Sequence, residues 1–418
     1  MATPINIVIL GSNMSGNLIS HYILKHITPA TTSSPVKVTI ISPSTKFYWT
    51  VAVPRALLNK PKLLKPEAIQ VDIITHLVKN YGPRGDKWEF LEAWARGVDI
   101  NRKTVTIEAV DHNVKDTIIP YDHLIIATGT RNWNPFQTPR SSSREDQLAI
   151  VAPFKSHGTT EEDLSGLKSW GDKIAEANTI FLVGGGPTGV ELAGEIKDAY
   201  PNKKVILATS GDILPTLQPR VSLIAKNLLE KLGVDVLVNT KVTAVNPAPS
   251  GQGVEVVLSS GETVPADLFI PTLGQKPNTD FLPKEFLNGH GFVQTTDYLN
   301  LPGHSNIWAL GDVIHYEGNR KLTTIDPYCQ VLTWNLRKVI LEGDKVAVGE
   351  SAGWSKYKHS LDQLMFVPVG TKQGTGQVKA WRVWSFFVWL LKGRDYMVPW
   401  IVKNVSGSSV PKKLKLVE

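Results

Sequence analysis

The chain has 418 residues, of which 42% are hydrophobic and 20% charged, with 33 glycines and 27 prolines. This length requires two or three domains, and this mixture excludes wholesale disorder, collagen-like repeats and a coiled-coil rod. Lysine and arginine outnumber aspartate and glutamate by 45 to 38, so the net charge is +7. Such a charge suits nucleic acid, an anionic membrane or acidic ligands, and composition alone does not choose among them.

The single cysteine, Cys329, excludes an intrachain disulfide, a redox pair of cysteines and a multi-cysteine zinc site. No segment approaches the roughly 18 consecutive apolar residues of a membrane-spanning helix. The apolar run at residues 5–10 has no basic segment before it and leads straight into glycine, which favours a first strand over a signal peptide. Ala2 removes the myristoylation signal. We therefore expect an intracellular, cytoplasmic protein without a metal site.

The chain opens with the pattern of a strand, a glycine turn and a helix. The strand is expected at residues 5–10, the turn at residues 11–16, and an apolar-periodic helix from there to about His26. A second strand follows at residues 36–41. This order predicts the start of a βαβ unit.

The first glycine turn departs from the dinucleotide-binding pattern at two positions. Gly11 and Gly16 are present, but Asn13 replaces the middle glycine, whose missing side chain lets the backbone approach a pyrophosphate. Ser42 stands at the end of the second strand, where an acidic ribose ligand is expected. Either the loop widens or the Asn13 amide itself binds phosphate, and adenosine must be held in another way than by an acid.

The same order of strand, glycine turn and helix recurs 173 residues later, where Gly184 takes the place that Gly11 has in the first unit. The expected strand, helix and next strand lie at residues 179–183, 190–200 and 204–208. Between the first two, Gly184 permits a tight turn, Gly186 lets the backbone approach a pyrophosphate, and Gly189 allows close packing of helix on strand. The phosphates would lie at the N-terminal amides of the helix, where the helix dipole favours negative charge. Two such units predict two dinucleotide-binding domains.

Other segments connect and follow these units. An apolar strand ends in Ala127, Thr128 and Gly129, and the polar stretch at residues 138–147 predicts a crossing between domains. After the second unit, one strand runs to Gly274 and another ends in Gly311 and Asp312. Beyond about residue 346 the composition changes, because five of the twelve tryptophans lie there.

Taken in order, the glycine loop, Ala127-Thr128-Gly129, the second glycine loop and Gly311-Asp312 resemble the flavoproteins with two dinucleotide-binding domains. The string at residues 186–195 resembles type II NADH dehydrogenases and AIF-like proteins, and especially the AIF-like group around ferroptosis suppressor protein. Three further strings match that group, at residues 47–56, 273–278 and 392–395. The resemblance covers nearly the whole chain.

The resemblance implies an α/β fold with two Rossmann-like domains, in which an NAD(P)H-binding domain is inserted into an FAD-binding domain and a C-terminal α+β domain follows. We expect the first part of the FAD domain at residues 1–145 and its second part at residues 271–345. The NAD(P)H domain would occupy residues 146–270. Residues 346–418 would form a C-terminal interface or membrane-proximal domain.

Motifs and resemblance together assign residues to the two cofactors, FAD and NADH or NADPH. The residues expected at FAD are Gly11, Asn13, Gly16, Ser42, Arg55, Ala127, Thr128, Gly129, Gly311 and Asp312. Those expected at NAD(P)H are Gly184, Gly186, Gly189, Glu191 and Gly274. By resemblance, Asp312 bonds the ribityl chain, although it can also cap a helix. Arg55 faces an FAD phosphate, with a surface ion pair as its alternative.

The reaction implied is hydride transfer from NAD(P)H to flavin, followed by release of the electrons. Residues 44–49, where disulfide reductases carry a cysteine pair, contain no sulfur. The acceptor is therefore expected to be a diffusing quinone, another small oxidant or oxygen. By resemblance, Glu191 and Lys392 are the acid–base candidates, with helix-surface solvation and a snorkelling surface lysine as the alternatives.

The choice between NADH and NADPH is open at this point. The strand after the second glycine loop ends in Leu207, Ala208, Thr209 and Ser210, without the carboxylate that would favour NADH and without an arginine. Hydroxyl groups tolerate either nucleotide, so use of both is plausible.

The segment at residues 381–391 is apolar and aromatic. As a helix it would reach only about 16 Å, half of a bilayer. It can lie in a membrane interface and admit a lipid-soluble quinone, or pack against the FAD domain. Residues 371–418 carry nine basic and two acidic residues, Lys415 among the basic ones, and so account for the whole net charge of +7. This distribution favours a membrane surface over nucleic acid.

Three functions remain open on the sequence. The leading hypothesis is an FAD-dependent NAD(P)H:quinone-type oxidoreductase, associated peripherally with a membrane. The second is a biosynthetic flavoenzyme acting on a specialised metabolite. The third is an AIF-like protein that binds nucleic acid or signals cell death through its basic charge.

Overall fold

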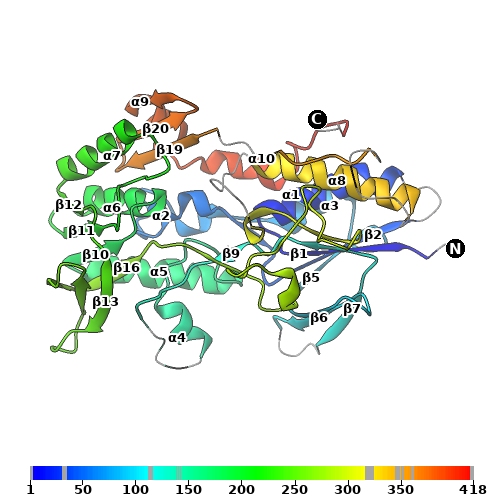
Figure 1. Ribbon diagram of the computed structural model, residues 1–418, viewed down its shortest axis with the longest axis horizontal. Helices are drawn as coiled ribbons and strands as arrows, with labels where there is room; N and C mark the ends of the chain where they lie inside the picture. The colour runs from blue at the N-terminus through cyan, green and yellow to red at the C-terminus, as the bar shows by residue number, and fades with distance from the viewer. Residues whose placement is uncertain are drawn as a thin grey trace.

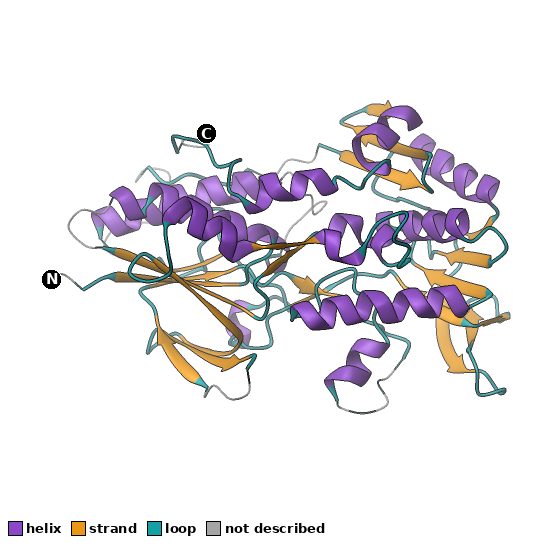
Figure 2. Cartoon of the chain, turned by 180° about the vertical axis from the view of Figure 1, so that it is seen from behind, coloured by secondary structure: helices purple, strands orange, loops and turns teal. Residues whose placement is uncertain are grey.

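The computed structural model describes residues 3–30, 35–111, 116–137, 139, 141, 143–315, 324–343, 349, 353–358 and 362–414. Two units, each built around a parallel sheet, lie side by side along the long axis of the molecule (Figure 1). Helices cover both sheets, and a smaller antiparallel sheet near the C-terminus packs on the second unit, as the view from behind also shows (Figure 2).

The first unit contains a seven-stranded sheet in the order β18-β8-β1-β2-β5-β6-β7. Its strands are β1 (Ile5–Leu10), β2 (Val36–Ser42), β5 (Trp88–Asp99), β6 (Thr104–Ala109), β7 (Thr117–Pro120), β8 (His123–Ile126) and β18 (Ile307–Ala309). The five strands from β18 to β5 are parallel, and β5, β6 and β7 form an antiparallel extension. Residues 7–10 of the central strand β1 are fully buried, as a near-continuous apolar run in a parallel sheet requires.

Two long helices, α1 (Met14–His26) and α8 (Ile325–Glu342), lie against each other on this unit. The phenol of Tyr22 in α1 donates a hydrogen bond of 2.6 Å to Asp326 at the start of α8. The single cysteine, Cys329, is fully buried in α8.

The second unit has a four-stranded parallel sheet in the order β12-β11-β10-β16. Its strands and helices are β10 (Thr179–Val183), β11 (Lys204–Ala208), β12 (Val234–Leu237), β16 (Leu268–Pro271), α5 (Thr160–Glu176), α6 (Pro187–Ala199) and α7 (Pro219–Leu232). A three-stranded antiparallel sheet made of β13 (Val242–Pro247), β14 (Val254–Leu258) and β15 (Thr263–Ala266) flanks it.

Short elements complete the two units. They are η1 (Thr28–Ala30), β3 (Lys46–Tyr48), η2 (Thr50–Ala52), α2 (Val53–Ala56), η3 (Pro66–Ile69), β4 (Gln70–Asp72), α3 (Ile73–Tyr81), β9 (Thr130–Arg131), α4 (Arg144–Ala149), β17 (Lys276–Pro277), η4 (Lys284–Phe286) and η5 (Gly311–Val313). Strands β9 and β17 pair with each other where the chain leaves the first unit and where it returns. This pair therefore places both crossings side by side.

The C-terminal region begins with the antiparallel strands β19 (Leu364–Val369), β20 (Gln373–Val378) and β21 (Trp381–Val383). Four helical pieces follow: α9 (Ser385–Val388), the π-helix η8 (Trp389–Gly393), η9 (Val398–Trp400) and α10 (Ile401–Val405). The sheet packs on α6 and α7, and α10 then returns to α1 of the first unit. There the Asn17 amide donates to Asn404 O at 3.1 Å, and a His21 ring nitrogen lies 2.8 Å from Val405 O.

The predicted fold class, an α/β protein with two Rossmann-like domains and a C-terminal α+β domain, is confirmed. The domain boundaries at residues 145, 270 and 345 stay a prediction. The segment 381–391, whose reach was calculated as if it were a helix, is not a continuous helix, because Trp381–Val383 pairs with β20 as a strand. Aromatic and β-branched side chains favour a pleated strand, and here the edge of β20 provides a partner for one.

Candidate functional site

A cleft of about 1950 Å³ runs between the two units and is lined by both glycine loops. The first loop lies where β1 leads into α1, and the second where β10 leads into α6. Parallel strands bring their carboxyl ends to one edge of a sheet, which is where α/β proteins bind nucleotides. The fold therefore turns both predicted loops toward one common space.

The first glycine loop packs its backbone closely against β8. Gly11 has a φ of +97°, and a Cβ there would lie 2.5 Å from Ala127 O. A Cβ on Gly16 would overlap the carbonyl oxygen of Gly11. Side chains are thus excluded at both positions, and α1 starts directly below the open face of the loop, where its first amides can meet a phosphate.

Asn13 lines the cleft, and its side chain is held by the neighbouring strand β3. Its amide donates to Tyr48 O at 3.1 Å, and its carbonyl oxygen accepts from Tyr48 N at 3.2 Å. Although Asn13 is the N-cap residue of α1, its side chain makes no capping bond. The amide is therefore turned onto β3, which is how the loop accommodates a side chain in place of the middle glycine.

The other residues expected at FAD line the same cleft, except for Gly311, Gly16 and Arg55. Ser42 ends β2, and Thr128 exchanges hydrogen bonds of 2.7 and 2.9 Å with Asn278 from the returning chain. Asp312 lies in the turn after β18, beside Gly311 with its φ of +82°. These residues line one side of the cleft together with the start of α1, whose first amides can meet a phosphate, so the chain fits FAD there.

Lys155 also lines the cleft, although nothing in the sequence around it marks it. Its ammonium lies 2.7 Å from a carboxylate oxygen of Asp312. A smaller pocket of about 120 Å³ joins the cleft at this point, and Lys155, Thr50 and Thr188 line it together. Lys155 reaches the cleft on the loop 150–158. Its position depends on how that loop packs between the two units, which the sequence does not show.

The second glycine loop leaves its middle position open. A Cβ on Gly189 would overlap the carbonyl oxygen of Gly184, and one on Gly184 would lie 2.6 Å from Thr272 O. A Cβ on Gly186, by contrast, would meet no atom within 4 Å. Gly186 is the N-cap of α6 and Pro187 its first residue, so free amides face the cleft. Gly274, which follows the neighbouring strand β16, also lines the cleft.

The cleft is strongly cationic. The charged side chains that line it are Lys46, Arg96, Arg131, Arg144, Lys155, Lys241, Lys276, Asp280 and Asp312. Both carboxylates are already paired, Asp280 with Arg131 at 2.8 Å and Asp312 with Lys155. Lys46, Arg96 and Arg144 are paired with Asp72, Glu108 and Glu162, which do not line the cleft. Among the described residues, Lys241 and Lys276 have no ion pair, and their charge favours anionic ligands such as the pyrophosphate of a dinucleotide.

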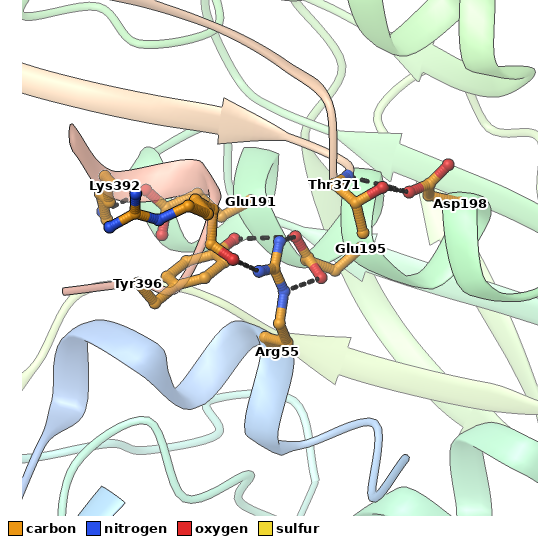
Figure 3. A network of polar contacts seen from close by, with 8 residues as sticks. Arg55, Glu191, Glu195, Asp198, Thr371, Lys392 and Tyr396 are labelled. Atoms are coloured by element: carbon orange, nitrogen blue, oxygen red, sulfur yellow. Dashed lines mark hydrogen bonds and ion pairs between the residues drawn. The ribbon is translucent and has the colours of Figure 1, made fainter. Parts of the chain in front are cut away.

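Arg55 does not line the cleft. It is 4% exposed, and its guanidinium donates two hydrogen bonds, of 2.9 and 2.7 Å, to the carboxylate of Glu195 in α6. A third, of 3.0 Å, goes to Arg394 O, and the phenol of Tyr396 donates to Glu195 at 3.2 Å (Figure 3). The expected contact of Arg55 with an FAD phosphate stays a prediction, and the observed ion pair is buried instead of lying on the surface.

Glu191 and Lys392 meet beside this cluster, with the ammonium 2.5 Å from a carboxylate oxygen (Figure 3). Glu191 projects from α6 and is buried, whereas Lys392 comes from the π-helix η8 201 residues later. Burial raises the pKa of Glu191, and the charge of Lys392 partly offsets that rise. Neither side chain lines the cleft, so the structure brings these two residues together without placing them at the cofactor loops.

Comparison with known proteins gives relatives along most of the chain. Oxidoreductase ptaL of Pestalotiopsis fici (strain W106-1 / CGMCC3.15140) is 33% identical over 96% of this chain and 99% of its own length. Ferroptosis suppressor protein 1 of Xenopus tropicalis is 26% identical over 77% of this chain and 80% of its own.

Solved structures share the fold. The sulfide:quinone oxidoreductase of Aquifex aeolicus superposes with a TM-score of 0.70 at 17% identity, covering 97% of this chain and 93% of its own. NDH2 of Plasmodium falciparum, solved in complex with NADH, gives a TM-score of 0.67 at 16% identity and covers 99% of both chains.

The family model described as pyridine nucleotide-disulphide oxidoreductase matches residues 5–330, which include both glycine loops and the whole cleft wall. The chain therefore belongs to the pyridine nucleotide-disulphide oxidoreductase family, with FAD and NADH or NADPH as its cofactors, as its two glycine loops predict.

Proposed function

We propose that this oxidoreductase takes a hydride from NAD(P)H and delivers the electrons to a quinone-type or other small diffusible acceptor. The observation that carries the proposal is the single cleft, which joins the FAD loop at Gly11 to the nucleotide loop at Gly186. FAD, when bound, supplies the group that accepts a hydride and later gives up its electrons. The two loops hold their cofactors against a shared space, which is the arrangement that direct transfer requires.

An acceptor from solution is favoured by the lack of a usable thiol. Residues 44–49 contain no sulfur. Cys329 is fully buried in α8, and burial raises the pKa of its thiol well above the ordinary value. A thiol held protonated in an apolar core is a poor nucleophile. Electrons leaving the flavin therefore need a diffusing partner.

The charged groups around the cleft have separate tasks in this proposal. Lys155 lies on Asp312 at the junction with the smaller pocket, where its ammonium would stabilise negative charge on a reduced flavin. Glu191 and Lys392 do not line the cleft but lie in contact with each other, and in this proposal Lys392 would give a proton to an oxygen of an acceptor that reaches this pair.

The assignment of Lys392 is tested by the Lys392→Met variant. Loss of a general acid lowers turnover with an acceptor by about 100-fold, while the anaerobic reduction of the flavin by NAD(P)H keeps its rate. The matched control is Lys403→Met, which removes an exposed lysine from α10. A Lys392→Met enzyme with full quinone turnover would remove the assignment.

We further propose that an anionic lipid surface delivers the acceptor. An aromatic surface made of Trp381, Trp384, Phe386, Phe387, Leu390 and Leu391 is exposed on β21, α9, η8 and the N-cap position of α9. Trp381 is 79% exposed and Trp384 68%, which is unusual for tryptophan. The segment around this surface is the basic one, with nine basic and two acidic residues at 371–418. Aromatic side chains beside cationic ones suit the interface of an anionic membrane.

The same π-helix carries Leu390 and Leu391 on its exposed side and Lys392 toward Glu191. A lipid-soluble acceptor would thus pass from the aromatic surface to the acid–base pair along one turn of chain. Among the described residues, no helix combines the length and apolar character needed to cross a bilayer. Contact with lipid would accordingly be peripheral.

The names of the similar proteins support a quinone as the electron acceptor but are also compatible with a second function. A sulfide:quinone oxidoreductase shares the fold. The relative with 33% identity, however, carries a name that states only an oxidoreductase, and it matches along nearly its whole length. A biosynthetic reaction on a specialised metabolite is therefore the second candidate.

One experiment distinguishes quinone reduction from a biosynthetic reaction. The visible spectrum of the purified protein is recorded anaerobically before and after NADH or NADPH, and turnover is then measured with simple quinones. We expect flavin absorbance that bleaches with the nucleotide and recovers with the quinone. Bleaching without recovery would favour the biosynthetic function. Absence of flavin absorbance even after incubation with FAD would contradict both.

A further inference from the structure

The second dinucleotide site contains a feature that bears on its choice of nucleotide. In this fold the adenosine ribose lies at the end of the second strand of the unit, and the group at the ribose 2′ position distinguishes NADH from NADPH. Here that strand is β11, which ends at Ala208 and is followed by Thr209 and Ser210. Both of these residues line the cleft.

Thr209 occupies the position at which an acid would bind a 2′-hydroxyl. It is 7% exposed, and its side chain packs on the glycine loop, since a Cβ on Gly185 would lie 2.7 Å from its hydroxyl oxygen. Ser210 follows as an exposed residue that lines the cleft. The strand end therefore offers hydroxyl groups and no negative charge.

A basic residue joins these hydroxyls from a distant part of the chain. The turn between β12 and β13 wraps around the end of β11, with hydrogen bonds from Thr209 N to Leu237 O at 2.9 Å and from Thr240 N to Thr209 O at 2.8 Å. A third, from Asn239 N to Gly211 O, measures 3.1 Å. These bonds fix Lys241 beside the strand end, where it is exposed and lines the cleft with Ser210.

No competing carboxylate reaches this end of the cleft. Among the described residues, Lys241 has no ion pair. Asp212, the acid nearest to Ser210 along the chain, and Asp235, the acid nearest to Lys241, do not line the cleft. The two carboxylates that do, Asp280 and Asp312, are paired with other cations. An acid that would repel a 2′-phosphate and hold a 2′-hydroxyl is therefore lacking from the described wall.

We infer that Ser210 and Lys241 form a binding site for the 2′-phosphate of NADPH, so that NADPH is preferred over NADH. The lysine supplies a point charge and the serine a hydroxyl donor, both of which bind phosphate strongly. This inference rests on the proposed function, because it assigns the nucleotide of the same site. Lys241 stands about 30 positions beyond the strand end, which is why the residues around Ser210 alone left the choice open.

The test compares nucleotide binding to the FAD-loaded protein by isothermal titration calorimetry. NADP⁺ is expected to bind at least about tenfold more tightly than NAD⁺, as a charge-assisted bond to phosphate requires. Lys241→Met should remove this difference by weakening NADP⁺ while leaving NAD⁺ unchanged, and Lys241→Glu should reverse it. The matched control is Lys204→Met, which removes an exposed lysine from the opposite end of β11.

Binding of 2′,5′-ADP, a fragment that carries the 2′-phosphate without the nicotinamide, separates this inference from the proposed function. Fragment binding that depends on Lys241 supports the site even in a protein without turnover. Equal affinity for NADP⁺ and NAD⁺, tighter binding of NAD⁺, or equal losses for both nucleotides in Lys241→Met would overturn it. Quinone reduction driven by NADH alone would overturn the inference and leave the proposed function intact.

Discussion

Asp163 is a carboxyl group with an unusual environment at the edge of the cleft. It is 1% exposed and accepts hydrogen bonds from His157 N at 2.6 Å and from the Ser156 hydroxyl at 2.8 Å. Burial nevertheless outweighs these bonds and raises its pKa to about 7. His157, which lines the cleft, has its pKa lowered to about 4 by the same burial. The loop therefore holds both groups neutral in mildly acidic solution.

The free energy of unfolding should reflect the Asp163 proton. The folded carboxyl binds its proton up to about pH 7 and the unfolded one only up to about pH 4. The stabilising effect is therefore complete below about pH 4 and is lost as the pH rises through 7, with a slope of at most about 1.4 kcal/mol per pH unit. In Asp163→Asn this loss should disappear. Denaturant unfolding of both proteins from pH 4 to 8 measures it, and parallel curves would contradict the assigned pKa.

Gly186 and Gly189 give opposite predictions although both belong to the second glycine loop. Gly186→Ala adds a methyl group into open space, so the protein should lose only about 1 kcal/mol of stability or less, as a change of helix cap does. The methyl would occupy the approach of the pyrophosphate and should weaken NAD(P)H binding at least about tenfold. Titration of the holoenzyme with nucleotide checks the affinity.

Gly189→Ala serves as the counterpart. Its methyl would overlap the carbonyl oxygen of Gly184, so overpacking should destabilise the protein by about 1–3 kcal/mol. If Gly186→Ala were the less stable of the two variants, the loop geometry described above would be wrong.

At this scale the sequence predicts residues whose role follows from backbone geometry. The glycines at positions 11, 184 and 186 lie in the cleft wall as expected, because a strand–turn–helix pattern places them there. Lys155 and Lys241 could not be found in this way, since each reaches the cleft through a loop that packs against a distant segment. The contact of Asn13 with Tyr48 likewise depends on the neighbouring strand β3 and on no local pattern.

Between elements, the ion pair of Arg55 and Glu195 joins α2 of the first unit to α6 of the second. Both side chains are at most 4% exposed, and Tyr396 and Arg394 of the C-terminal region complete the hydrogen bonds. The pair thus ties α2, α6 and the C-terminal region together (Figure 3). Burial of this pair adds little to the free energy of unfolding by itself, because both charges lose their hydration.

Removing one partner should be far more costly than removing both. Arg55→Leu leaves the buried Glu195 charge uncompensated and should lower the free energy of unfolding by about 3–5 kcal/mol. The double variant Arg55→Leu/Glu195→Leu should recover part of that loss. Arg102→Leu, which breaks an exposed contact with Asp99 at 3.8 Å, should cost at most about 1 kcal/mol. Additive losses in a double-mutant cycle by urea unfolding would contradict the coupling.

Among elements, the two glycine-loop units could be predicted because hydrophobic strands and periodic helices alternate in sequence order. The C-terminal region could not be predicted in this way, because the apolar side chains at 381–391 fit a strand or a helix equally well over so short a segment. The choice is made by the free edge of β20, with which Trp381 and Val383 pair. That edge is formed by residues which the segment itself does not contain.

Over the whole molecule, positive charge and exposed aromatic rings coincide at one end of the chain. Arg382 lies 5.8 Å from the ring centre of Trp384, and Lys403 lies 5.6 Å from that of Trp400. Lys415, which was counted with the basic tail, lies outside the described residues. The antiparallel extension with β7 lies at the far end of the molecule from α9 (Figure 1). Contact with a charged surface would consequently orient the protein.

Vesicle binding should therefore depend on the aromatic surface. We expect the protein to sediment with vesicles that contain phosphatidylserine, less so at high salt and less so with phosphatidylcholine alone. The double variant Trp384→Ser/Phe386→Ser should reduce the bound fraction severalfold, because it removes buried apolar area at the interface. Ile118→Ser is the control, since Ile118 on β7 is 64% exposed at the other end. Equal loss in the control, or binding unaffected by the double variant, would contradict the proposed lipid contact.

The return of the chain to its first unit sets an order in which the protein can fold during synthesis. The second unit is continuous in sequence from α5 to β16, so it is complete once Pro271 has left the ribosome. The first unit must wait for β18 at residues 307–309, and α1 must wait longer still for α10. Until then the polar side chains of Asn17 and His21 lack the carbonyl partners that their burial requires. The second unit can thus form before the first, which is completed only after α10 has been made.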